Sequence, residues 1–149
     1  MCDSGSYPSL ILLDLSSNLI SSVGFFGMAS LKSLNLSENK LNSNTLSYDK
    51  KLFFEGLCSL VELNLSKNDL NVSCQETLKL NSLERLNLSE NRMYFFPNKL
   101  SDLPALQELD LSKINVTEIN GAILPIEEKF SGHEGFKSLQ ILDLSDNKL

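Results

Sequence analysis

The chain has 149 residues, enough for a single domain with a sizeable core, and its 42% hydrophobic and 21% charged residues are close to the averages of soluble proteins. A formal net charge of −6 disfavours nucleic acid and anionic membranes as main partners, because both require a basic surface. No apolar run approaches the roughly 18–20 residues that a membrane span needs, and the first residues lack the basic and apolar regions of a signal peptide. These features predict a soluble, cytoplasmic domain without a membrane span.

One pattern, LxxLxLxxNxL, recurs six times along the chain. The two leucines of its central LxL point to one face of a short strand, and the Asp or Asn between them points to the other. One such turn cannot bury its leucines, whereas stacked turns share a continuous core, so successive strands are predicted to pair in parallel. The six copies are Leu10–Ile20, Leu31–Leu41, Leu60–Leu70, Leu83–Met93, Leu106–Val116 and Leu139–Leu149.

The ninth place of the pattern holds an asparagine in five of the six copies. It follows the strand at the point where the chain turns inward, and its amide is predicted to pair backbone groups that the turn would otherwise leave buried and unpaired. In the fifth copy Ile114 takes this place, which predicts a local irregularity with Asn115 as the candidate substitute. The five structural asparagines are Asn18, Asn39, Asn68, Asn91 and Asn147.

The pattern resembles the leucine-rich-repeat family, and the likeness covers essentially the whole chain. The resemblance implies an α/β solenoid in the shape of a curved arc. Six parallel short strands would line its concave side, and 3₁₀ turns, short helices and loops would line its convex side. The resemblance also implies that the asparagines form a ladder along the solenoid.

The connections between the strands refine the resemblance. Residues 18–31 look like the short repeat of the regulatory subunit of protein phosphatase 1, whose convex side consists of 3₁₀ turns. Residues 91–106 look like the FP/LP repeats of intracellular signalling scaffolds and receptor ectodomains. This second likeness places Phe96, Leu100 and Leu103 in the core.

Two connections are longer than the others. Residues 44–56 are predicted to hold a convex helix that begins at an Asn or Ser cap and ends at Gly56. Residues 123–130 are predicted to form a short helix with Pro125 in its first turn, followed by a loop over residues 131–135.

We interpret residues 1–149 as a single domain whose repeats start at residues 10, 31, 60, 83, 106 and 139. No amphipathic cap precedes the first strand, and the chain ends at Leu149, the last letter of a repeat. Because the end turns of a solenoid expose leucines and a strand edge, these uncapped ends predict a piece of a longer array.

Catalytic and cofactor chemistry find no support in the sequence. His133 is the only histidine, and no motif ties a nucleophile to it. Glu127 and Glu128 are adjacent, and neighbours on a helix point apart. The glycines form no phosphate-binding motif. We therefore expect no enzyme activity and no cofactor.

The cysteines bear on the compartment. Cys2, Cys58 and Cys74 form an odd set without CxxC spacing, which indicates no metal site and favours free thiols, with a Cys58–Cys74 disulfide as the alternative. Sequons at Asn71 and Asn115 are independent of the repeat consensus. A glycan at either position, or the disulfide, would favour an extracellular protein.

The variable positions of the predicted concave side carry mixed charges. They are consistent either with a recognition face for a protein partner or with a solvated face that keeps the protein soluble. We interpret the chain as a non-catalytic protein–protein interaction module of an intracellular scaffold or regulatory subunit. The alternative is a fragment of an extracellular leucine-rich-repeat receptor ectodomain that binds ligand, as in a Toll-like receptor. The candidate partner-binding residues are Glu62, Lys67, Arg85, Glu90, Arg92, Glu108 and Lys113.

Overall fold

The structure is a computed structural model that describes residues 7, 9–22, 28–42, 54, 56–71, 80–93, 97–119 and 136–149. The helix and loop predicted within residues 123–135 lie outside these residues. So does the helix predicted within residues 44–56, except for Phe54 and Gly56.

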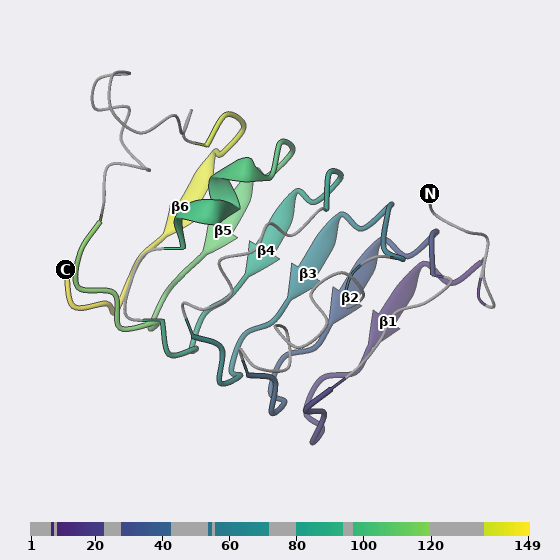
Figure 1. Ribbon diagram of the computed structural model, residues 1–149, viewed down its shortest axis with the longest axis horizontal. Coiled ribbons are helices and arrows are strands. Elements are labelled where there is room, and N and C mark those ends of the chain that lie inside the picture. Colours follow the sequence, from purple (N-terminus) through teal and green to yellow (C-terminus); the bar gives the residue numbers. More distant parts are fainter. Residues whose placement is uncertain are drawn as a thin grey trace.

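Six strands of three residues each form one parallel sheet, and they follow one another in chain order (Figure 1). Each strand pairs with the next in the register that places equal positions of the repeat side by side, as Leu13 lies beside Leu34 and Leu34 beside Leu63. The predicted sheet of six parallel strands is therefore confirmed. The strands are β1 (Leu12–Asp14), β2 (Ser33–Asn35), β3 (Glu62–Asn64), β4 (Arg85–Asn87), β5 (Glu108–Asp110) and β6 (Ile141–Asp143).

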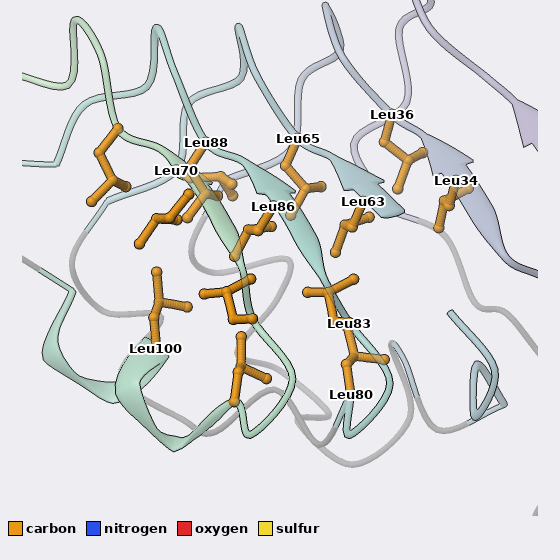
Figure 2. Packing of buried hydrophobic residues seen from close by; sticks show 14 of the residues in the cluster. Leu34, Leu36, Leu63, Leu65, Leu70, Leu80, Leu83, Leu86, Leu88 and Leu100 are labelled. Carbon is orange, nitrogen blue, oxygen red and sulfur yellow. The ribbon is translucent and has the colours of Figure 1, made fainter. Parts of the chain in front are cut away.

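The core lies on one side of this sheet and consists almost entirely of leucines. The two leucines of the central LxL are buried in the second to fifth repeats, as Leu63 and Leu65 illustrate. Figure 2 shows the pairs of the second to fourth repeats in a row along their strands, with Leu80 and Leu83 on the segment that leads into β4 and Leu100 on the connection that follows it. Burying each leucine contributes about 1.5–3 kcal/mol, so the stack rather than any single repeat supplies the stability.

One 3₁₀ helix, η1 (Asn98–Asp102), lies in the connection from β4 to β5. Its i to i+3 hydrogen bonds run from the Leu100 N–H to the Pro97 carbonyl and from the Leu103 N–H to the Leu100 carbonyl. Leu100 and Leu103 are buried, as predicted, while Phe96 lies outside the described residues. In the part of the chain that the structure describes, no helix has the length and apolar character needed to cross a bilayer.

The ninth-place asparagines join consecutive repeats through hydrogen bonds. The Nδ2 of Asn68 donates to the carbonyl of Leu36 in the preceding repeat at 3.0 Å and to that of Leu65 in its own repeat at 3.1 Å. Its Oδ1 accepts from the N–H of Leu41 at 3.0 Å. Equivalent bonds connect the other asparagines that have a preceding repeat, namely Asn39, Asn91 and Asn147.

The fifth repeat is irregular, as predicted. Ile114 is fully buried at the asparagine place and offers no acceptor to Met93, whose equivalents in the other repeats donate to an asparagine Oδ1. Asn115 adopts a left-handed conformation with φ of 66°, and its side chain makes no hydrogen bond within the described residues. Asn115 therefore does not replace the missing amide, which corrects that expectation. The next asparagine, Asn147, instead accepts from the N–H groups of both Ile114 and Val116 at 3.1 Å.

Candidate protein-interaction surface

The face of the sheet opposite the leucine core, here the concave face, presents columns of equivalent residues because the strands pair in register. We name three of these columns. The strand column opens each strand and contains Leu12, Ser33, Glu62, Arg85, Glu108 and Ile141. The Asx column closes each strand and contains Asp14, Asn35, Asn64, Asn87, Asp110 and Asp143. The turn column lies three residues beyond and contains Ser17, Glu38, Lys67, Glu90, Lys113 and Asp146.

The Asx column has a structural role. In every repeat its Oδ1 accepts a hydrogen bond from the N–H of the serine two residues later, as in Asp14 and Ser16 at 2.8 Å. The Ser16 hydroxyl donates to the same oxygen at 2.7 Å. Hydrogen bonds from Ser16 lower the pKa of Asp14, and those from Ser145 lower the pKa of Asp143. The Asp or Asn and the Ser recur in every repeat because together they stabilise the turn that follows each strand.

From the second repeat onward, the charges in the turn column alternate in sign. All six residues of this column have φ between 53° and 55°, which is the left-handed conformation. Because this conformation repeats, the six side chains lie in one row. Lys67 forms an ion pair with Glu38, which also accepts a hydrogen bond from the Ser17 hydroxyl at 2.7 Å. The hydrogen bond from Lys67 is the main cause of the lowered pKa of Glu38. The hydrogen bond to Glu38, followed by attraction to Glu38 and Glu90, raises the pKa of Lys67.

The strand column also pairs opposite charges. Arg85 Nη2 lies 3.7 Å from Glu62 Oε2 on the neighbouring strand, and Arg85 Nη1 lies 3.8 Å from Glu84 Oε2. Arg92 Nε lies 3.4 Å from Asp69 Oδ1 at the edge of the face, two residues beyond the turn column. Because these pairs are exposed to solvent, each stabilises the fold weakly, by about 0–1 kcal/mol.

The structure distributes the candidate partner-binding residues over two columns and one edge. Three lie in the strand column, three lie in the turn column, and Arg92 lies at the edge. Sequence reasoning did not include Ser17 and Glu38, which belong to the same row of turn-column contacts as Lys67. The alternation of charge at one position of successive repeats was the signal that could have identified Glu38. The seven candidates are Glu62, Lys67, Arg85, Glu90, Arg92, Glu108 and Lys113.

Cys58 is disulfide-bonded in the structure, so the expectation of free thiols is wrong for this residue. It is exposed, and its carbonyl accepts a hydrogen bond from the Ser82 hydroxyl at 3.2 Å. The other two cysteines, Cys2 and Cys74, lie outside the described residues.

The described residues contain no cluster suited to a metal ion, since no three or more of their His, Cys, Asp and Glu side chains lie in such an arrangement. His133, Glu127 and Glu128 lie outside that part of the chain.

Comparison with known families decides what these repeats are. A leucine-rich-repeat profile matches residues 58–115, and a second profile of the same repeat matches residues 30–52. This chain is a leucine-rich-repeat protein. No curated protein sequence matches it significantly.

Solved leucine-rich-repeat structures share the fold. An internalin (inlF) from Listeria monocytogenes superposes with a TM-score of 0.66 at 19% identity, over 95% of this chain and 36% of the internalin chain. TLR13, in a complex with ssRNA13, superposes with a TM-score of 0.65 at 31% identity, over 93% of this chain and 18% of the TLR13 chain. The leucine-rich-repeat protein thus spans little more than a third of the first chain and under a fifth of the second.

Proposed function

We propose that this leucine-rich-repeat protein is a non-catalytic module that binds a partner protein on its concave face. The observation that carries the proposal is the in-register sheet, which presents columns of exposed charged side chains on one preformed surface. A rigid surface of this kind loses little conformational freedom on binding, so modest contacts over a large area suffice. The family, whose members are generally binding modules, supports the same proposal.

The charges of this face favour a protein over a nucleic acid. The turn column contains three acidic residues, Glu38, Glu90 and Asp146, against two lysines, Lys67 and Lys113. Nucleic-acid binding draws its affinity from an excess of basic over acidic side chains, and this face has no such excess. The RNA of the TLR13 complex is therefore not part of the proposal for this chain.

For the compartment, we propose that the protein matures in an oxidising environment as part of an extracellular or luminal protein. The disulfide at Cys58 supports this proposal, because such bonds persist outside the reducing cytosol. Asn71, which begins a sequon, is exposed and is therefore accessible to a glycan. A cytoplasmic scaffold, or a regulatory subunit of the kind that the first repeat resembles, is the competing proposal.

The mass of the protein from its natural source separates these two compartments. In an oxidising compartment, reduction and alkylation should reveal a disulfide, and glycosidase should lower the mass if a sequon is occupied. A chain isolated under thiol-trapping conditions with all three cysteines free and no glycan would support the cytoplasmic proposal instead.

The concave face itself is tested by charge reversal. Partners cross-linked to the protein in its native setting are identified by mass spectrometry, and their affinities are then measured with purified proteins. Arg85→Glu combined with Arg92→Glu should change the affinity of a concave-face partner at least tenfold, because the two exchanges reverse the charge at two exposed positions of this face. A basic partner should bind more tightly, and an acidic partner more weakly. The control combines Asp102→Arg with Glu118→Arg, two exposed charges outside the sheet. Equal effects of both double variants would move binding away from the concave face.

A further inference from the structure

The last two strands, β5 and β6, differ from the rest of the concave face in how their charges are paired. Arg85 on β4 lies between Glu62 on β3 and Glu108 on β5 in the register of the sheet. Its two amino groups contact Glu62 and Glu84. Within the described residues, no ion pair includes Glu108, which is exposed. This carboxylate is thus available to a partner without breaking an internal contact.

An exposed apolar side chain lies beside that carboxylate. Ile141 opens β6 as the register neighbour of Glu108, and 56% of its surface is exposed. Register neighbours on parallel strands lie about 4.8 Å apart, so one partner side chain can contact both. From β2 to β5 the strand column is polar, which makes Ile141 the apolar point at this end of the face.

The charge around Ile141 has one dominant sign. Asp143 follows two residues later on the same face of β6 and lies beside Asp110 of β5. The turns beyond these strands add Asp146 and Lys113, and Lys148 lies at the edge of the face in the position equivalent to Arg92. Four carboxylates, counting Glu108, therefore face two ammonium groups. On β3 and β4, by contrast, Glu62 and Arg85 cancel.

We propose that β5 and β6 form the docking site for a basic and apolar segment of a partner protein. In this site an aliphatic side chain of the partner covers Ile141, while a flanking Arg or Lys pairs with Glu108 or Asp143. The charge complementarity selects this occupant, since an acidic segment would meet uncompensated carboxylates and a purely apolar one would leave them without pairs. The inference deepens the proposed function and rests on it.

A capped tripeptide tests this site directly by NMR. Acetyl-Arg-Leu-Arg-amide is titrated to millimolar concentration into the ¹⁵N-labelled protein, with acetyl-Glu-Leu-Glu-amide as the control ligand. The basic peptide should shift the backbone amides of β5 and β6, and the acidic peptide should not. Glu108→Gln and Ile141→Ser should each weaken binding about fivefold to tenfold. Asp102→Asn, which removes an exposed carboxylate from η1, should leave binding unchanged.

Several results would overturn the docking site. The site is refuted if the basic peptide shifts no amides, or shifts only those of β2–β4. It is also refuted if both peptides cause equal shifts, or if Glu108→Gln and Ile141→Ser both leave the affinity for the basic peptide unchanged. None of these results touches the broader proposal, because a partner could still bind elsewhere on the concave face. The broader proposal fails separately, when reversal of Arg85 and Arg92 changes the affinity of the partner no more than its control does.

Discussion

Replacement of Asn91 by Ala tests whether the asparagines hold consecutive repeats together. Asn91 is 2% exposed, and its Nδ2 donates to the carbonyls of Leu65 at 3.0 Å, Leu88 at 2.8 Å and Ser89 at 3.3 Å. Its Oδ1 accepts from the N–H of Leu70 at 3.0 Å. Each bond contributes a net of about 0.5–1.5 kcal/mol, and a buried N–H left unpaired costs about 1–3 kcal/mol. The variant should therefore lower the free energy of unfolding by about 3–4 kcal/mol.

Asn18→Ala provides the matched control for this measurement. Asn18 occupies the same place in the first repeat, is exposed, and donates only within its own turn, to the carbonyls of Leu15 and Ser16. Its loss should cost no more than about 1 kcal/mol. Urea unfolding followed by circular dichroism gives both values, provided that each transition is two-state. Equal losses for Asn91→Ala and Asn18→Ala would refute the idea that bonds between repeats carry the stability.

Three further outcomes follow from the described contacts. Ile114→Asn should restore an acceptor for the Met93 N–H and lower the free energy of unfolding in urea by less than about 1 kcal/mol. Ile114→Ala should lower it by about 2–5 kcal/mol, because it only removes buried apolar surface. The reverse order would contradict the idea that Ile114 interrupts the row of asparagines. Cys58→Ser should lower the free energy of unfolding by about 2–4 kcal/mol and abolish any effect of dithiothreitol on the melting temperature, an effect that must first be seen in the unmodified protein. Because the pKa of Glu38 is lowered in the folded state, its pairing with Lys67 stabilises the fold above the ordinary carboxyl pKa of 4.5, and this stabilisation is lost as the pH falls. Glu38→Gln should therefore reduce the loss of stability at acid pH, measured by urea unfolding across the pH range. An unchanged stability–pH curve would contradict the pairing.

Residues whose partners are set by the repeat itself were predictable. The leucines of LxL, such as Leu63 and Leu65, alternate with a polar residue, and this alternation is enough to decide which side of the strand is buried. The break in the pattern at Ile114 likewise predicted an irregular turn. The substitute proposed for it, Asn115, was wrong, because its left-handed backbone leaves its amide without a hydrogen bond inside the described structure.

Contacts between repeats were less predictable because a residue in a parallel sheet has two register neighbours at similar distances. The charges of Glu62, Arg85 and Glu108 are compatible with attraction on either side of the arginine. The structure pairs Arg85 with Glu62 and with Glu84, its neighbour along the chain, and leaves Glu108 without an ion pair among the described residues. Which acidic side chain pairs with Arg85 depends on the side-chain conformations in the folded protein rather than on the order of residues in the sequence.

The sequence by itself determined the six-strand parallel sheet, the leucine core and the columns of the concave face. Its repeat specifies burial and hydrogen bonding residue by residue, and repeats that share this pattern stack with equal positions side by side. Only the tertiary structure decided which charges neutralise one another, that Cys58 is bonded, and that Ile141 lies exposed beside Glu108. These features depend on distances between side-chain atoms in the folded protein, which spacing along the chain does not encode.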